Sequence, residues 1–251
     1  LYVRIMTNRR RILMKPIIGI VSTPYLDKDG DKMFCVDYNI YNWIIKSGGT
    51  PLTIMPTNID DIYEKRYREL NYLTGKEIDE LIRILDMCDG IIKPGGTSIQ
   101  SFHKAIYNYT VIRNMPYLGI CNGMQLMVKA YDNDTNLIKT PVNHNIPNVN
   151  AHYIWISEKS LLRQIVNKRT MLVSSRHNYC VHDLKNLRIT ATDDFGVIEA
   201  VENPICDYNI GLQWHPEVYD FDHEDSTNIF NSFIEASSNH DKQKVYKKTI
   251  Y

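Results

Sequence analysis

The stretch PYLGICNGMQLMVKA, Pro116–Ala130, places Cys121 at the point where a continuous apolar run gives way to a helical pattern. The run before the cysteine has the character of a strand that is buried on both faces of a sheet. After the cysteine, apolar residues recur at i, i+3, i+4 and i+7 from Met124 to Tyr131, which predicts a helix that begins at about Asn122. The stretch therefore predicts a strand, a sharp turn at the cysteine and a helix.

The same alternation of strand and helix patterns extends along the chain in both directions. Four more short apolar runs resemble the strand before Cys121: PIIGIV (16–21), PLTIMP (51–56), GIIKPGG (90–96) and IGLQW (210–214). Amphipathic helix patterns separate the early runs, and residues 150–202 hold short β-rich runs separated by polar turns. This order predicts an α/β fold, with a mostly parallel open sheet, flanking helices and a mixed or antiparallel extension of the sheet.

The domain organisation follows from where these patterns begin and end. One domain is expected over residues 16–238, with its last helix pattern at 226–236. Residues 1–15 are a basic N-terminal extension that we expect to be disordered. Residues 239–251 are a polar, basic tail that we expect to fray.

The composition describes an ordinary globular protein. Of the 251 residues, 43% are hydrophobic and 23% are charged, and 29 basic residues balance 29 acidic ones. This balance gives no overall field that would attract nucleic acid or an anionic membrane, so neither is an expected partner. No apolar run approaches the roughly 20 residues that cross a bilayer. Five scattered cysteines do not suit a secreted disulfide framework, which predicts a cytoplasmic location.

Two interpretations of Cys121 are open at this point. Free cysteine is often only a small apolar residue in a core. Alternatively, a cysteine alone on a strand-to-helix turn is held out of the sheet as a nucleophile, and the helix N-terminus favours its thiolate. Gly119 and Gly123 favour the second interpretation, because strand and helix cross so closely in such an elbow that side chains would collide. A G-x-C-x-G pattern by itself remains a weak signal.

The segment GLQWHPE, 211–217, offers a base for such a nucleophile. His215 and Glu217 are two residues apart, and on an extended backbone such residues point to the same side. Pro216 cannot donate to a central strand ladder, which favours a position at the rim of the sheet, where open α/β sheets bind ligands. In this interpretation His215 takes the proton of Cys121 and Glu217 holds the imidazole tautomer. In the alternative interpretation the segment is a surface turn.

The segment KPGG, 93–96, follows an earlier strand. Glycines at Gly95 and Gly96 allow backbone N–H groups to approach a substrate closely. Together with the N–H group of Asn122, they would form an oxyanion hole for the nucleophile.

Taken together, the segments around Cys121, His215 and Gly95 resemble the class I glutamine amidotransferase family. The resemblance is to its stand-alone γ-glutamyl hydrolase branch, which includes γ-glutamyl-γ-aminobutyrate hydrolases, and it extends from about residue 16 to residue 236. It implies a flavodoxin-like core and a γ-glutamyl thioester on Cys121, with His215 and Glu217 as the other two triad members and Gly95 and Gly96 as oxyanion glycines. It implies neither a cofactor nor a metal ion.

The segment SSRHNYCV, which begins at Ser174, resembles the part of the family that lines the γ-glutamyl pocket. On this resemblance Ser175, Arg176 and His177 border the substrate. Gln125 matches a family glutamine near the α-amino and carboxylate groups of the substrate.

Two residues of this segment have alternative interpretations. The guanidinium of Arg176 suits an acidic group on the substrate, but it equally suits a position in solvent or beside an acid such as Glu199. His177, Cys180 and His182 are potential zinc ligands, but they lack the second pair that such sites show, so a hydrogen-bonded histidine beside a pocket is favoured.

Departures from the family pattern leave the substrate open. The sequence after PGG and the sequence after the elbow helix both differ from the hydrolase branch. The leading prediction is a cysteine-dependent hydrolase of γ-glutamyl amide bonds, which acts on glutamine or a γ-glutamyl amine. The alternatives are an ammonia-donating glutaminase subunit of a separate synthetase and a catalytically idle binding or regulatory module. A homodimer and a synthetase chain are the protein partners that the resemblance allows.

Overall fold

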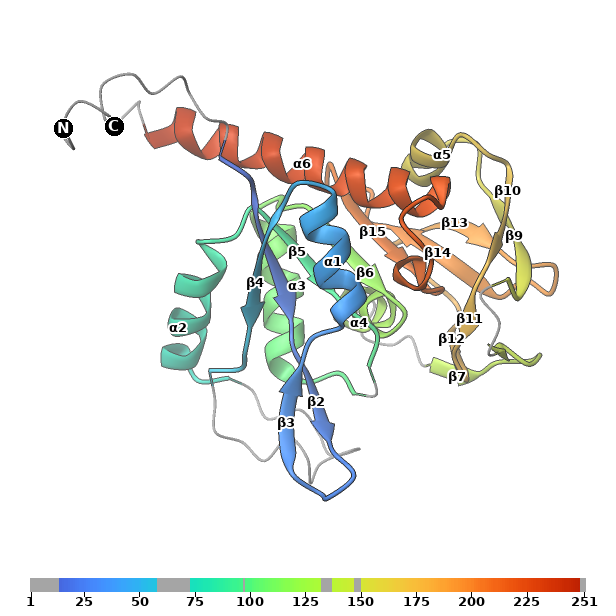
Figure 1. The fold of residues 1–251 in the computed structure, drawn as a ribbon, viewed down its shortest axis with the longest axis horizontal. Helices are drawn as coiled ribbons and strands as arrows, with labels where there is room; N and C mark the ends of the chain where they lie inside the picture. The colour runs from blue at the N-terminus through green and yellow to red at the C-terminus, as the bar shows by residue number, and fades with distance from the viewer. Residues whose placement is uncertain (1–13, 58–72, 97, 132–136, 147–149, 249–251) are drawn as a thin grey trace.

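The computed structural model describes residues 14–57, 73–96, 98–131, 137–146 and 150–248 (Figure 1). The predicted extension before residue 14 lies outside them. The described residues hold a nine-stranded sheet. Its parallel half consists of β4 (Thr50–Ile54), β1 (Ile17–Val21), β5 (Gly90–Lys93), β6 (Tyr117–Ile120) and β15 (Asn209–Leu212), in this order across the sheet. Its antiparallel half continues from β15 with β14 (Ile198–Glu202), β13 (Arg188–Thr192), β9 (His152–Ile156) and β10 (Thr170–Val173).

This architecture confirms the predicted fold class. The apolar runs of the sequence analysis form the parallel strands, and all four residues of β5, of β6 and of β15 are buried, as expected for strands covered on both faces. The β-rich runs between 150 and 202 form the antiparallel extension.

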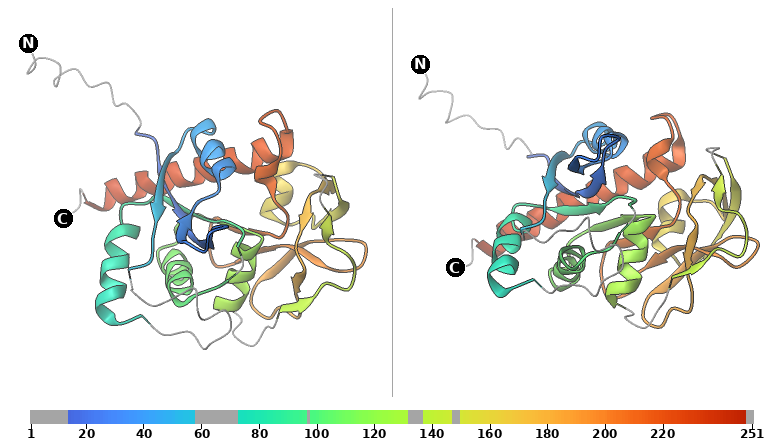
Figure 2. Two further views of the ribbon diagram at one scale, coloured as in Figure 1. Left: turned by 60° about the horizontal axis from the view of Figure 1, so that its bottom comes forward. Right: turned by 90° about the horizontal axis from the view of Figure 1, so that it is seen from below.

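Helices cover both faces of the sheet (left panel of Figure 2). One face is covered by α1 (Tyr38–Lys46), α6 (Glu224–Lys248) and the short α5 (Leu161–Val166), and the other by α2 (Gly75–Leu85), α3 (Ser101–Ile112) and α4 (Asn122–Tyr131). On the first face Trp43 stacks on Phe230 with ring centroids 4.8 Å apart. On the second, Met124 and Met127 of α4 are fully buried, so the methionine stripe after Cys121 is part of the core.

Local signals fix where two of the helices begin. Asp37 caps α1 by accepting hydrogen bonds from the N–H groups of Asn39 and Ile40. Thr74 and Glu77 form a capping box at the start of α2. The last helix begins near the predicted position but is longer than the expected range 226–236, because its C-terminal half is rich in lysine and glutamine, which favour helix.

Three small two-stranded sheets complete the described chain. They pair β2 (Thr23–Leu26) with β3 (Lys32–Cys35), β8 (Asn145–Ile146) with β11 (Ser175–Arg176), and β7 (Leu137–Lys139) with β12 (Tyr179–Val181). The β2–β3 hairpin continues directly from β1 and projects from the body of the protein (Figure 1).

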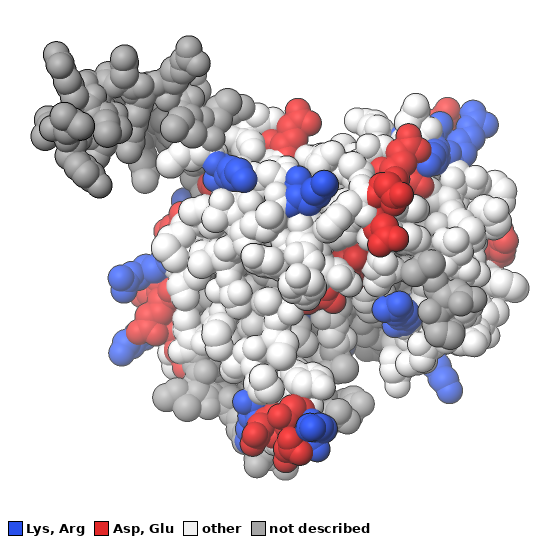
Figure 3. Space-filling model, in the orientation of Figure 1, with Lys and Arg blue, Asp and Glu red and all other residues white. Residues whose placement is uncertain are grey.

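The described surface is mixed in charge. On the face drawn in Figure 3, basic and acidic side chains lie in small groups, and neither sign dominates among the described residues. None of the helices described is both long and apolar enough to span a lipid bilayer.

Candidate active site

The three segments that were predicted to act together follow neighbouring parallel strands. β5 ends at Lys93, β6 at Ile120 and β15 at Leu212. The strand register pairs Lys93 with Gly119 and Leu212 with Ile120. The KPGG loop, the cysteine and the histidine therefore start from one edge of the sheet, the carboxyl edge at which open α/β sheets bind ligands.

Cys121 forms the sharp turn between β6 and α4. Its φ of 51° lies in the left-handed region, which costs a residue other than glycine on the order of 1–3 kcal/mol. Its N–H donates to the carbonyl of Leu212 at 2.7 Å, and its carbonyl accepts from the N–H of Gln125 at 3.1 Å. The adjacent strand and the first helical turn thus hold the backbone in this conformation, and Cys121 as a whole is 8% exposed.

The two glycines of the elbow are required by the close crossing of strand and helix. A Cβ atom on Gly119 would lie 2.6 Å from the carbonyl carbon and oxygen of Gly123. A Cβ atom on Gly123 would overlap the carbonyl oxygen of Lys93. Both contacts are with backbone, which cannot move aside as a flexible side chain can.

His215 and Glu217 are brought together, although by a different backbone than we expected. Nδ1 of His215 lies 2.6 Å from Oε1 of Glu217, whose side chain is 3% exposed. The sequence analysis assumed an extended backbone between them, but residues Pro216–Val218 form a single 3-10 turn, η2, with proline in its first turn. Proline fixes φ near the helical value and has no N–H to leave unpaired there, so it favours this turn.

The side chains of His215 and Cys121 form a hydrogen bond. Because Nδ1 of His215 faces Glu217, it is Nε2 that serves the thiol. Burial alone lowers the pKa of His215, but the charge of Glu217 and the hydrogen bonds to Cys121 and Glu217 outweigh this effect, and the pKa lies well above its usual value. The geometry therefore favours an imidazolium beside a thiolate.

The KPGG loop packs directly against this pair. A Cβ atom on Gly95 would lie 2.9 Å from Cε1 of His215 and 3.6 Å from Cβ of Cys121. A Cβ atom on Gly96 would lie 2.9 Å from Cγ2 of Thr23, at the start of the β2–β3 hairpin. Gly95, Gly96 and Asn122 thus surround Cys121, while their role as an oxyanion hole stays a prediction.

Lys93 is a residue of the site that the sequence analysis did not single out. It is fully buried, and its Nζ donates to the carbonyl of Pro94 at 2.9 Å and to Oδ1 of Asn122 at 3.2 Å. Burial lowers the pKa of Lys93 from 10.5 to about 8, and the charge of Cys121 acts against this decrease. The available signal was a lysine that ends an otherwise apolar strand, GIIK.

Ser174 is a second such residue. Its hydroxyl accepts from the N–H of His215 at 3.1 Å and donates to the carbonyl of the same residue at 3.2 Å. This double contact holds the backbone of the histidine from the side of the antiparallel strands. The sequence analysis placed Ser174 in a substrate-lining segment without giving it a role.

The four residues predicted to border the substrate lie in different surroundings. Gln125 is buried and donates to the carbonyl of Tyr179 and to Oε1 of Gln213, each at 3.2 Å. The hydroxyl of Ser175 donates to the carbonyl of His144 at 2.6 Å.

Arg176 is exposed on β11, whereas His177 is buried and turned away from solvent. Glu199 is fully buried beside histidines. His182 is exposed and does not join His177. Contacts of Gln125, Ser175, Arg176 and His177 with a substrate stay predictions.

Comparison with known proteins gives a family and a fold. The sequence pattern of the Peptidase C26 family matches residues 16–217. A glutamine amidotransferase-like protein of Rickettsia prowazekii is 27% identical, with 89% of this chain and 98% of that protein covered.

Two solved structures have the same fold. A GMP synthase subunit from Thermoplasma acidophilum superposes with a TM-score of 0.64 at 16% identity, over 92% of this chain and 98% of that one. The glutaminase domain of CTPS from Trypanosoma brucei, with acivicin bound, gives a TM-score of 0.61 at 20% identity, over 89% and 94% of the two chains.

Proposed function

Since this chain belongs to the Peptidase C26 family of class I glutamine amidotransferases and γ-glutamyl hydrolases, we propose that it cleaves a γ-glutamyl amide through a thioester on Cys121. The observation that carries the proposal is the strained backbone of Cys121 beside a histidine whose other ring nitrogen faces a buried glutamate. A cysteine that served only as a core residue would need neither the strain nor the ion pair.

In the first half of the proposed reaction, the thiolate of Cys121 attacks the δ-carbonyl carbon of the γ-glutamyl group. The C–N bond breaks, and the imidazolium of His215 gives its proton to the departing nitrogen, which leaves as ammonia or an amine. Glu217 keeps the ring oriented and favours its charged form. The N–H groups of Gly95, Gly96 and Asn122 are the donors proposed for the oxyanion of the tetrahedral intermediate.

In the second half a water molecule attacks the thioester. The neutral His215 takes a proton from this water, the C–S bond breaks, and glutamate leaves with the oxygen from water. Cys121 and His215 then return to the thiolate and imidazolium. No redox step and no cofactor are needed for this balance.

The substrate is proposed as a class: glutamine or a γ-glutamyl amine. Arg176 is the residue of the predicted substrate segment with a guanidinium exposed to solvent, which suits a carboxylate on the amine portion of a substrate. Replacement of Arg176 by methionine is then expected to raise KM for substrates with such a carboxylate by roughly 10-fold or more, with glutamine turnover little changed.

A second candidate function is that of an ammonia donor to a separate synthetase. It is favoured by the likeness to the GMP synthase subunit of Thermoplasma acidophilum, which has this fold as a separate chain. The two functions differ in one observable respect: an ammonia donor releases ammonia much faster when its synthetase is present, whereas a hydrolase needs no second chain.

The test is turnover of glutamine and a panel of γ-glutamyl amines by the wild type and by Cys121→Ser. We expect release of glutamate by the wild type alone and a loss of at least about 10-fold in the variant, because a serine hydroxyl is a far weaker nucleophile than a thiolate. Equal turnover by the two proteins would contradict the proposal. A folded wild type that is inactive with every substrate, with or without candidate synthetases, would support the idle binding module.

A further inference from the structure

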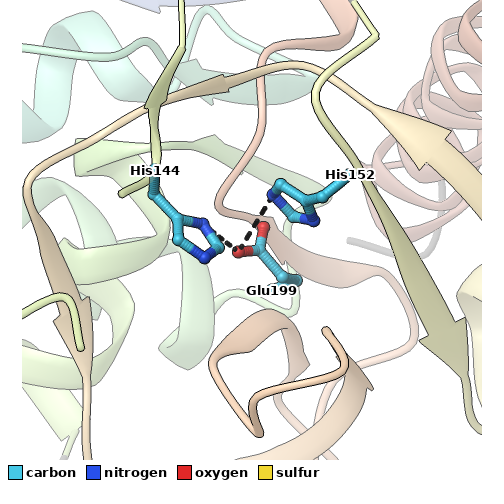
Figure 4. Close-up of side chains that lie close together, drawn as sticks. All are labelled: His144, His152 and Glu199. Carbon is cyan, nitrogen blue, oxygen red and sulfur yellow. Dashed lines mark ion pairs between the residues drawn. The ribbon is translucent and has the colours of Figure 1, made fainter. Parts of the chain in front are cut away.

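Three histidines and a glutamate form a buried cluster beside the antiparallel half of the sheet. Their side chains are almost fully buried: 2% exposed in His144 and His177, 0% in Glu199 and 18% in His152. Figure 4 shows the rings of His144 and His152 turned toward the carboxylate of Glu199. The cluster joins β9, β14 and the segments that adjoin β8 and β11, so chain segments far apart in sequence meet in it.

Each imidazole of this histidine–glutamate cluster has one ring nitrogen against an acceptor outside the cluster. These contacts are Nε2 of His144 with Oδ2 of Asp193 at 3.1 Å, Nδ1 of His152 with the carbonyl of Tyr153 at 3.2 Å, and Nδ1 of His177 with the carbonyl of Tyr179 at 3.2 Å. Carbonyl and carboxylate oxygens accept hydrogen bonds, so the proton of each neutral ring lies on this outer nitrogen. The inner nitrogens are then lone pairs.

The inner atoms are therefore acceptors that face other acceptors. Oε1 of Glu199 lies 3.3 Å from Nδ1 of His144, 3.5 Å from Nε2 of His177 and 3.8 Å from Nε2 of His152. Within the described ranges, neither carboxylate oxygen of Glu199 and no Nε2 of His152 has a hydrogen bond of acceptable geometry. A buried carboxylate without donors is strongly unfavourable, which indicates that something positive belongs between these atoms.

The spacing is that of ligands around one metal ion. Zinc binds imidazole nitrogen and carboxylate oxygen at about 2.0–2.2 Å, and two ligands at a tetrahedral angle then lie about 3.3–3.5 Å apart. The nitrogens of His144 and His177 lie 3.1 Å apart, and those of the pairs with Glu199 lie at 3.3 and 3.5 Å. One ligand atom from each of His144, His152 and Glu199 lies within 4.8 Å of the other two.

We propose that His144, His152, His177 and Glu199 bind one divalent transition-metal ion, with zinc as the first candidate. Three imidazoles and one carboxylate suit zinc among the common ions, whereas calcium and magnesium prefer oxygen ligands. The outer contacts with Asp193, Tyr153 and Tyr179 are of the kind that orient metal-binding histidines. The two positive charges of the ion balance the carboxylates of Glu199 and Asp193, which are both buried.

The ion would act as a structural link rather than as a reagent. Ser175 donates to the carbonyl of His144, and Ser174 next to it holds the backbone of His215. A metal that fixes His144 and His177 thereby fixes the segment that positions the proposed base. The sequence analysis expected no metal, because it paired His177 with Cys180 and His182 and not with histidines of distant segments.

The test uses the full chain and the metal alone. The purified protein is freed of metal with a chelator and titrated with Zn²⁺ and, separately, with Co²⁺. We expect one zinc ion per chain by elemental analysis and the visible absorption of tetrahedral cobalt. We also expect the melting temperature to rise by about 5–10 °C at a free zinc concentration roughly 100-fold above Kd.

Two variants and a matched control complete the experiment. His152→Asn changes the most exposed ligand, and Glu199→Gln removes the charge; each is expected to weaken metal binding by about 100-fold or more. His182→Asn changes an exposed histidine of a nearby segment and should bind like the wild type. The proposal is overturned if the folded wild type takes up neither ion, which would mean that a proton fills the cluster. It is also overturned if substoichiometric zinc is bound equally by the wild type and both variants.

Discussion

Nζ of Lys93 lies 3.2 Å from Oδ1 of Asn122, and this contact joins the loop after β5 to the elbow after β6. The ammonium also donates to Pro94, so one buried charge connects the backbone of the KPGG loop with the first residue of α4. These are the two segments that would supply the oxyanion donors.

The lowered pKa of Lys93 predicts a pH dependence of stability. Folded Lys93 loses its proton near pH 8 and the unfolded chain near pH 10.5, so between these values the unfolded chain binds more protons and the free energy of unfolding rises with pH. The rise attributable to Lys93 is about 3 kcal/mol across that range and should be missing in Lys93→Met. Urea unfolding of the wild type, Lys93→Met and the exposed control Lys159→Met would show it. Parallel pH profiles of all three would contradict it.

Replacement of Glu217 by glutamine should move the pH profile of activity. The charge of Glu217 helps to keep the pKa of His215 high, so its removal lowers that pKa. If imidazolium is the active form, the alkaline limb of kcat/KM shifts to lower pH, and kcat/KM at its optimum falls by about 10²- to 10⁴-fold. An unchanged alkaline limb would mean that this limb does not report His215.

Alanine at Gly119 should disrupt the elbow. Its Cβ atom would press on the backbone of Gly123, at a cost of about 1–3 kcal/mol in stability and with loss of activity. Gly75→Ala is the matched control, because no atom lies within 4 Å of a Cβ atom there and alanine favours helix. Thermal unfolding and turnover of both variants provide the comparison. Equal stability of the two would contradict the close crossing.

Ser174→Ala should lower kcat by about 10-fold or more with little change in KM. The variant loses both hydrogen bonds to the backbone of His215, each worth about 0.5–1.5 kcal/mol, and leaves the proposed γ-glutamyl contacts in place. Steady-state kinetics would separate the two parameters. A rise in KM alone would assign Ser174 to substrate binding instead.

Much of the fold could be predicted from sequence because its strands are short apolar runs bounded by turns. The elbow was also readable, since two glycines around Cys121 have a steric cause that sequence spacing reveals. Lys93 was missed because a lysine in an apolar strand gives no hint of which buried acceptors it will meet. The histidine–glutamate cluster was missed for a similar reason: His144, His152 and Glu199 come from separate segments, and only the pairing of the antiparallel strands brings them together.

Selective modification of Cys121 tests the central claim most directly. The folded protein is treated with a diazo-ketone analogue of glutamine, and each cysteine is quantified by peptide mass spectrometry. Cys35 and Cys206 are more exposed than Cys121, so exposure alone would favour them. We predict labelling of Cys121 alone, slowed in His215→Ala and abolished by unfolding. Equal labelling of the exposed cysteines, or faster labelling of Cys121 in the unfolded chain, would show that Cys121 is an ordinary core cysteine.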